Sequence, residues 1–285
     1  MDTRRPRYAA TMDDKELWGL IDPSTWDRIV VVSPHFDDAA LGAAHLLSTY
    51  PGSTVITVLA GRPPAYPEPV TDWDAAGGFA TGDDVVGVRQ EEDRAAMASL
   101  GAEPVWLDFP DHQYLAPADR PTPTDVAPDL AKAVEAAGPT AVFLPMGLAN
   151  PDHVLTHDAG LMAREAWPAG DGSEAGEPGS RAPAWFCYED AGHKHLPGLL
   201  AWRVAKLFRG GLWPTPAVVP VRPDPEAKRT AIWLYASQIG PLERDHLLSE
   251  RLAANTPEQY WRLEPPPPGW ERLSSADDLD ARRPD

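Results

Sequence analysis

The sequence holds a single cysteine, Cys187, so no disulfide bond can form within the chain. Long apolar runs are also missing: none reaches the roughly 18 residues of a membrane-spanning helix, and none follows the basic amino terminus as in a signal peptide. Basic residues are few, with 25 Lys and Arg against 43 Asp and Glu. The resulting net charge of -18 argues against nucleic acid or an anionic membrane as a partner. These absences predict a cytoplasmic protein.

Two further chemical classes are disfavoured by what the sequence lacks. Cys187 lies in the apolar segment 184–188, and we interpret it as a small buried hydrophobic residue rather than a nucleophile. Neither a Gly-x-Gly-x-x-Gly pattern nor a P-loop follows any apolar segment. A nucleotide-binding enzyme is therefore a weak alternative.

Short apolar segments alternate with segments of helical composition along most of the chain. Predicted strands are 29–32, 54–60, 104–109, 140–145, 185–188, 212–221 and, as a last edge strand, 260–263. Predicted helices are 13–21, 39–48, 85–100, 126–137 (beginning near the cap candidate Asp125), 159–167, 225–238 and 245–254. This alternation predicts an α/β fold: a single Rossmann-like domain with a mostly parallel sheet and helices on both faces. We assign it residues 1–264, and we expect the Pro-rich and charged tail 265–285 to be extended.

Three side chains with acid–base or metal-binding capacity follow the first predicted strand: His35, Asp37 and Asp38. In an open α/β sheet, the carboxyl ends of the strands border the crevice where ligands bind. Positions three apart at the start of a helix lie close together, so His35 and Asp38 can converge on one divalent metal ion. Asp37 would then stand beside the metal, able to take a proton. The alternative is that the two aspartates only cap the helix and interact with its dipole.

A second loop of the same kind follows the strand predicted at 140–145. It carries Asn150, Asp152 and His153 and then passes into an apolar helix. If the two strands are parallel, both loops lie at the same edge of the sheet. His153 could then complete a site of two histidines and one aspartate that leaves a position open for water, as catalytic zinc sites do.

The motifs Ser-Pro-His-Phe-Asp-Asp at 33–38 and Asn-Pro-Asp-His at 150–153 resemble those of the LmbE-like, or PIG-L, family of metal-dependent N-acetylglucosaminyl deacetylases. Segments 89–93, 107–114, 188–190 and 235–238 also resemble landmarks of that family. The resemblance implies that the metal is bound by His35, Asp38 and His153. It further implies that Asp37 is the general base.

The remaining site residues are assigned from the same resemblance and their positions. Arg89 is implied to bind substrate, and we add Asp111 and Tyr114 as substrate-binding candidates. Asp111 is also a candidate to hold a metal-binding histidine in place, and Asp152 is expected to orient its neighbours. Asn150 departs from the family, whose second motif usually begins with a histidine that helps to stabilise the oxyanion. An asparagine amide can donate a hydrogen bond to an oxyanion, but it cannot supply a proton.

These observations predict a zinc-dependent hydrolase, with another divalent metal as the alternative, that removes an acetyl group from an N-acetylglucosamine-type sugar. The sugar would be part of a small molecule or of a glycosylated natural product. Two alternatives stay open: an amidase acting on a sugar-thiol conjugate, and a non-catalytic homologue that binds metal and sugar. A homo-oligomer is also left open.

Two other segments need an interpretation. Residues 61–87 form a long segment rich in Gly, Pro and Asp that contains Tyr66, Trp73 and Phe79. We interpret it as a lid over the substrate, with the alternative that its aromatic residues only fix the loop. His193 and His195 are expected to lie in an exposed loop rather than to bind a second metal, and we likewise do not expect His45 to be a ligand.

Overall fold

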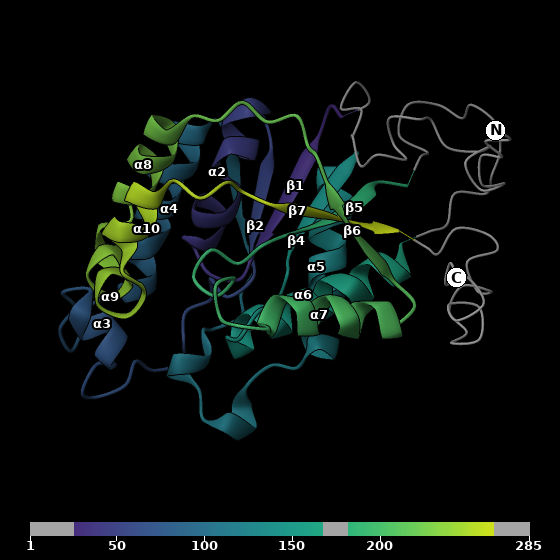
Figure 1. The fold of residues 1–285 in the computed structure, drawn as a ribbon. Helices are drawn as coiled ribbons and strands as arrows, with labels where there is room; N and C mark the ends of the chain where they lie inside the picture. The colour runs from purple at the N-terminus through teal and green to yellow at the C-terminus, as the bar shows by residue number, and fades with distance from the viewer. Residues whose placement is uncertain (1–25, 168–181, 265–285) are drawn as a thin grey trace, which may run out of the picture.

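The computed structural model describes residues 26–167 and 182–264, which form a seven-stranded sheet with helices on both faces (Figure 1). The strands are β1 (Ile29–Ser33), β2 (Thr54–Thr57), β3 (Glu103–Trp106), β4 (Ala141–Pro145), β5 (Ala184–Tyr188), β6 (Trp213–Ala217) and β7 (Tyr260–Glu264). The helices are α2 (Asp38–Thr49), α3 (Asp72–Ala76), α4 (Val85–Leu100), α5 (Pro123–Ala137), α6 (Pro151–Ala166), α7 (Leu199–Arg209), α8 (Pro225–Trp233), α9 (Ala236–His246) and α10 (Leu248–Ala254). Two short 3-10 turns, His112–Tyr114 and Pro117–Asp119, follow β3.

The strand order is β3-β2-β1-β4-β5-β7-β6. The strands from β3 to β5 are parallel, and β7 is antiparallel to both of its neighbours. This confirms the predicted α/β fold with a mostly parallel sheet. The chain moves from β1 outward to β3 and then returns to β4 on the other side, so the order reverses between β1 and β4. Such a reversal opens a crevice at the carboxyl ends of the two strands, and both predicted metal-binding motifs follow these strands.

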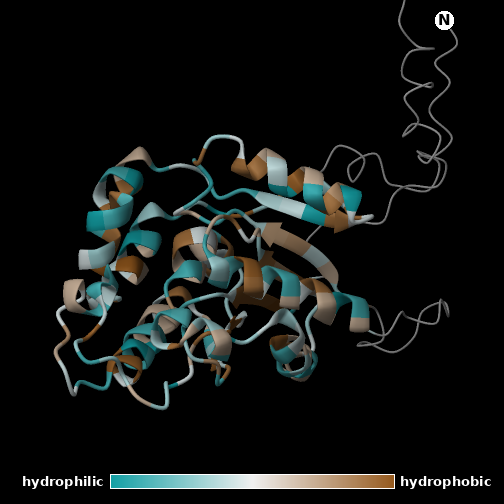
Figure 2. Ribbon diagram, turned by 90° about the horizontal axis from the view of Figure 1, so that it is seen from below, coloured by the Kyte–Doolittle hydropathy of each residue, from teal (hydrophilic) through white to brown (hydrophobic). Residues whose placement is uncertain are grey.

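The alternation of side chains along β1 explains why both faces of the sheet are covered. Val31 packs in a core on one face, whereas Val30 and Val32 pack in a separate core on the other. Each of the three side chains is at most 1% exposed. Figure 2 shows the central strands mostly in the hydrophobic colour, whereas the surrounding helices carry both colours. Strands buried on both faces need continuous apolar sequences, and this is how they were found in the sequence.

The prediction that residues 260–263 form an edge strand is wrong. Strand β7 lies between β5 and β6, and β6 is the outer strand on that side. Strand β6 contains Pro214 and Pro216, which have no backbone N–H to donate to a further neighbour. Proline is tolerated at the edge of a sheet for this reason, so β6 suits the outer position better than β7 does.

The helix predicted over 225–238 is two helices, α8 and α9, separated at Leu234 and Tyr235. The Tyr235 hydroxyl donates to Oδ1 of Asp93 at 2.7 Å, and the backbone N–H of Ser237 donates to Oε1 of Glu92 at 2.8 Å. These two bonds from α4 fix the start of α9, so tertiary contacts override the continuous helical composition. The helix predicted over 245–254 is likewise divided between the end of α9 and α10.

Smaller differences concern helix starts and the ends of the chain. Helix α5 is capped by Thr122, and Asp125 bonds back to Thr122 in a capping box instead of being the cap itself. Within the described residues, none of the helices has the length and apolar character needed to cross a bilayer. The helix expected at 13–21 and the tail expected at 265–285 lie outside the described residues.

Candidate functional site

The turn after β1 presents three polar side chains toward the crevice. Pro34 follows the strand, and α2 begins at Asp38 with Asp37 at the N-cap position. The Asp37 side chain makes no capping hydrogen bond. Asp38 instead ties the turn together, because its Oδ2 accepts from the backbone N–H of His35 at 3.0 Å. Capping therefore does not account for Asp37, whose carboxyl group stays available inside the crevice.

The loop after β4 is organised by Asn150. Its Oδ1 accepts from the backbone N–H of Asp152 at 2.8 Å and so caps helix α6, and Ala149 before it has a positive φ of 55°. This tight entry places His153 in the first turn of α6, where its side chain is buried. Nδ1 of His153 lies 2.8 Å from Oδ1 of Asp190, so its Nε2 points toward the turn after β1.

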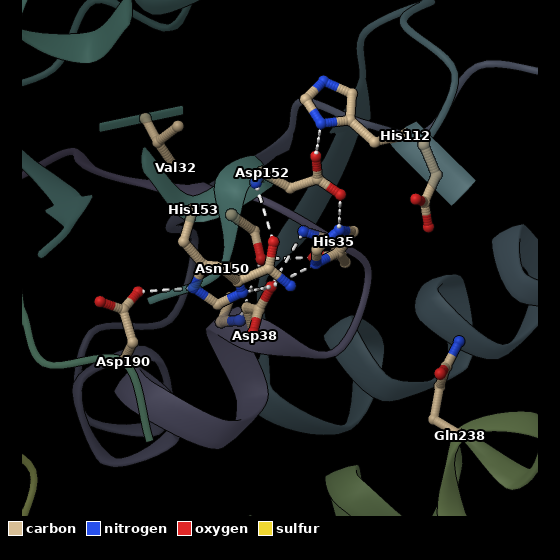
Figure 3. Close-up of polar contacts among 12 residues, drawn as sticks. Val32, His35, Asp38, His112, Asn150, Asp152, His153, Asp190 and Gln238 are labelled. Atoms are coloured by element: carbon tan, nitrogen blue, oxygen red, sulfur yellow. Dashed lines mark hydrogen bonds and ion pairs between the residues drawn. The ribbon is translucent and has the colours of Figure 1, made fainter. Parts of the chain in front are cut away.

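The two loops bring an imidazole, a carboxylate and a second imidazole together (Figure 3). Oδ2 of Asp38 lies 3.1 Å from Nδ1 of His35 and 3.3 Å from Nε2 of His153. One donor atom from each residue lies within 4.8 Å of the other two. Two imidazole nitrogens and a carboxylate oxygen are a ligand set that suits zinc and other divalent first-row metals. The chemistry and the convergence of this set therefore fit the divalent metal expected from the sequence.

The ionisable groups of the cluster shift one another's pKa values. Burial, followed by the negative charge of Asp38, raises the pKa of Asp37 to about 7. Burial alone would also raise the pKa of Asp38, but the charges and hydrogen bonds of His153 and His35 hold it well below its ordinary range. Burial would lower the pKa of His153, but the charges of Asp38 and Asp190 outweigh it and raise that pKa. Asp38 is thus kept as a carboxylate, whereas Asp37 can exchange a proton near neutral pH.

Carboxylates orient both histidines of the cluster. Nε2 of His35 lies 2.9 Å from Oδ2 of Asp152, whose other oxygen contacts His112, and Asp190 contacts His153 (Figure 3). Partners of this kind fix the orientation of the imidazole ring and the position of its proton. Asp111, a candidate for this role, instead accepts hydrogen bonds from the backbone and side chain of Gln113. It still lies near the cluster, because it forms a second group of possible ligands with His35 and Asp152.

A cavity of about 270 Å³ opens onto the cluster. All of the site residues proposed from the sequence line it: His35, Asp37, Asp38, Arg89, Asp111, Tyr114, Asn150, Asp152 and His153. Arg89 is 4% exposed, and its guanidinium donates to Oδ1 of Asp74 at 2.8 Å and to the Tyr114 hydroxyl at 3.1 Å. Because Asp74 lies on α3, the segment 61–87 helps to build the cavity wall. Trp73 lines the cavity too, and its indole N–H donates to Gln238 at 2.8 Å, so the same residue also fixes the segment.

The cavity is also lined by residues that were assigned no catalytic, metal-binding or substrate-binding role from the sequence, among them Trp73, His193, Gln238 and His246. The ring of His193 lies 5.2 Å from that of His153 and 5.4 Å from that of His246, centroid to centroid. The expectation that both His193 and His195 lie in an exposed loop holds only for His195; His193 is half-buried and faces the cavity. The spacing of His193 and His195 in the sequence did not predict this arrangement, because His193 lies beside His153 and His246, which come from distant segments.

Comparisons with known proteins agree with this geometry. The PIG-L family model, described as GlcNAc-PI de-N-acetylase, matches residues 30–164, and we found no match among curated protein sequences. The structure of a deacetylase triple mutant from the teicoplanin biosynthetic pathway is 25% identical, with a TM-score of 0.62 over 85% of this chain and 100% of that chain. The A40926 pseudoaglycone deacetylase is 25% identical, with a TM-score of 0.63 over 84% and 98%. A zinc-inhibited form of teicoplanin deacetylase, at 23% identity, has a TM-score of 0.63 over 85% and 100%.

The matched segment contains both loops of the cluster, from the turn after β1 to the histidine on α6. The solved structures extend the agreement beyond it, because they cover most of this chain and nearly all of their own. Residues 30–164 therefore match the PIG-L, or LmbE-like, family, and the chain is similar in structure to deacetylases.

Proposed function

We propose that this protein is a zinc-dependent N-deacetylase that removes the acetyl group from an N-acetylglucosamine-type sugar on a glycosylated natural product or other small molecule. The observation that carries the proposal is the convergence of His35, Asp38 and His153 beside Asp37, whose carboxyl group makes no capping hydrogen bond. The relatives support the substrate class, since their structures are described as deacetylases of teicoplanin biosynthesis and of the A40926 pseudoaglycone.

The metal would be held by His35, Asp38 and His153, and a bound divalent ion would lower the pKa of water from about 15.7 to roughly 7. Around it, Asp190 holds the ring of His153 and Asp152 holds that of His35. Zinc is the proposed ion because imidazole and carboxylate ligands suit it.

Asp37 is the residue proposed to move the proton. It accepts a proton from the attacking water while the water oxygen forms a bond to the acetyl carbon. The C–N bond of the amide then breaks, and Asp37 returns the proton to the departing nitrogen, which leaves acetate and a free amine on the sugar. The raised pKa of Asp37 suits this task, because burial makes its carboxylate a stronger base than that of an exposed aspartate.

Two hydrogen-bond donors that line the cavity, Asn150 and His193, are the candidates to stabilise the negative oxygen that develops on the acetyl carbonyl. The Oδ1 atom of Asn150 is engaged as the helix cap, so the amide group is oriented and its N–H₂ can donate. Burial, followed by the charge of His153, lowers the pKa of His193 to about 4. His193 is therefore a neutral imidazole at pH 7, whose ring N–H can donate a hydrogen bond into the cavity.

The test is acetate release from N-acetylglucosaminides by the purified protein as isolated, after chelation, and after zinc is returned. Zinc should be titrated up to one equivalent and beyond it, because a relative has been described in a zinc-inhibited form. Zinc-restored acetate release supports the proposal. Release of an amine only from a sugar-thiol conjugate would favour the amidase alternative. Metal and sugar binding without acetate would favour the non-catalytic alternative.

A further inference from the structure

A second cavity of about 250 Å³ adjoins the one that holds the metal cluster. The two cavities share the lining residues Leu41, Gly192, Leu242 and His246. The second cavity lies among residues of α2, α8, α9 and α10, and α2 packs directly against α8 (Figure 1). Ligand pockets usually measure about 300 to 1,000 Å³. Each cavity alone falls below that range, whereas the two together fall within it, so a ligand larger than one sugar would occupy both.

The charges around the second cavity are unusual for a chain with a net charge of -18. Lys194, Lys228, Arg229 and Arg251 line it together with only two acids, Glu189 and Glu258. Glu258 is neutralised by Lys228, with Nζ 2.8 Å from Oε1, and it also accepts from the Tyr260 hydroxyl. Glu189 lies 3.7 Å from Nζ of Lys194 and accepts from the Trp261 indole N–H.

Arg251 is the cation that these acids do not compensate. Its Nε donates to the backbone carbonyl of His246 and its Nη1 to that of Ala191, and it forms no ion pair with any residue of 26–167 or 182–264. The guanidinium is therefore anchored by neutral carbonyls while its positive charge stays unbalanced beside the cavity. A guanidinium held in this way suits a carboxylate or phosphate, which it can bind through two parallel hydrogen bonds.

We propose that the second cavity binds the acceptor, the part of the substrate to which the amino sugar is attached, and that Arg251 selects acceptors with an acidic oxygen group such as a carboxylate. The inference rests on the proposed deacetylase function, because the sugar and its acetyl group must occupy the first cavity. The acceptor then extends from the first cavity into the second past Gly192 and His246, which line both cavities. The proposed substrate is therefore an N-acetylglucosaminide whose acceptor carries a negative charge.

Two substrates that differ in the charge of one group and by one methyl group test the acceptor site: 4-carboxyphenyl N-acetyl-β-glucosaminide and its methyl ester. The zinc-loaded full chain should use the acid with a kcat/KM about tenfold above that of the ester at low ionic strength, as for one charge-assisted hydrogen bond. Arg251→Gln should bring that ratio close to one, and Arg251→Lys should leave an intermediate ratio. Lys132→Gln is the matched control, since Lys132 is an exposed residue of α5 that does not line either cavity.

Two measurements keep the test decisive if Arg251→Gln does not fold. Raising the salt concentration toward 1 M should lower the preference of the wild-type protein for the acid, because the Debye length falls to about 3 Å. A β-carbon at Gly192 would lie 3.6 Å from Nδ1 of His246, so the side chain of Gly192→Leu should narrow the passage between the two cavities. Gly192 does not have a positive φ, so the substitution does not strain the backbone. That variant should lose more kcat/KM toward the aryl glycoside than toward free N-acetylglucosamine.

Equal use of acid and ester by the wild-type protein, or an unchanged ratio in Arg251→Gln, would overturn the acceptor-site proposal while leaving the deacetylase function intact. The absence of acetate from both substrates and from free N-acetylglucosamine, with zinc bound, would instead overturn the proposed function.

Discussion

Nδ1 of the His153 ring lies 2.8 Å from the Oδ1 carboxylate oxygen of Asp190, and the second Asp190 oxygen accepts from the backbone N–H of Leu148 at 2.9 Å. Asp190 comes from the end of β5, the neighbour of the strand that precedes His153. The position of Nε2 of His153, and with it the shape of the metal cluster, therefore depends on the register of β4 and β5.

Replacing Asp190 by asparagine should weaken zinc binding about 10- to 100-fold, because the ring of His153 loses the charged partner that orients it. The affinity can be measured by competition with a chromophoric chelator. Asp158→Asn is a matched control: Asp158 lies on the same helix as His153 and pairs with Arg203 at 3.7 Å, away from the cluster. Equal zinc affinity in the two variants would show that Asp190 has no part in holding the metal.

Replacing Asp37 by alanine should lower kcat by about 100- to 10,000-fold, the usual contribution of a general acid–base group. Zinc should stay bound at one equivalent, because the proposed ligand atoms come from His35, Asp38 and His153. Acetate release and metal content need to be measured on the same preparation. A wild-type rate in a fully metallated variant would remove Asp37 from the mechanism, whereas lost zinc would mean that it belongs to the ligand set.

Asp93 should make the folded state less stable as the pH rises from about 4 to 6. Its side chain is fully buried, and burial raises its pKa from 3.8 to about 6 although Trp106 and Tyr235 donate hydrogen bonds to it. Between these two values the folded state holds a proton that the unfolded state has released. The free energy of unfolding should therefore fall by about 3 kcal/mol across this range.

The variant Asp93→Asn should lack this slope, because an amide does not titrate and the Tyr235 hydroxyl can turn to accept from it. Urea unfolding at pH 4, 5, 6 and 7 gives both curves, and the difference between wild type and variant isolates Asp93 from the other carboxyl groups. If the free energy of unfolding changes with pH in the same way in wild type and variant, the pKa of Asp93 is the same in the folded and unfolded states.

The parts of the site that could be predicted are those whose residues lie close in sequence and follow strands of the parallel sheet. His35, Asp37 and Asp38 share one turn and Asn150, Asp152 and His153 another, and parallel pairing of β1 with β4 was enough to bring them to one edge. Asp190 and His193 were not assigned to the site. They follow β5 in a loop that contacts α9 and α10, where composition alone placed the helix boundaries wrongly.

The outer part of the sheet was mispredicted for a related reason. Residues 260–263 have the apolar character of a strand, but sequence alone does not say which neighbours a strand will have. The pairing is decided by which backbone donors are available, and the prolines of β6 leave that strand suited to the edge. Both carboxyl-terminal strands were predicted as strands, whereas their order in the sheet was not.

Substitution of Asn150 can separate its two roles. Its Oδ1 caps α6, whereas its N–H₂ is the proposed donor to the developing oxyanion. Asn150→Ser keeps a good capping residue but removes the amide, so stability should change little while kcat falls by about 100- to 1,000-fold, the loss found when one oxyanion donor is removed. Asn150→Ala removes both, so the same fall in kcat should come with a loss of about 1 kcal/mol in the free energy of unfolding.

The comparison of these two variants shows whether Asn150 takes over the hydrogen-bonding role of the histidine that is usual at this position in the family. If Asn150→Ser keeps the wild-type kcat, the amide has no catalytic role, and His193, half-buried against the His153 ring in the same cavity, becomes the principal donor to the oxyanion. His193→Gln should then lower kcat sharply with little change in KM, whereas His195→Gln, an exposed neighbour that does not line the metal cavity, should not lower kcat toward free N-acetylglucosamine. If kcat falls in Asn150→Ser and stability does not, an asparagine performs at this position the hydrogen-bonding part of the usual histidine's role, and the proton must come from Asp37.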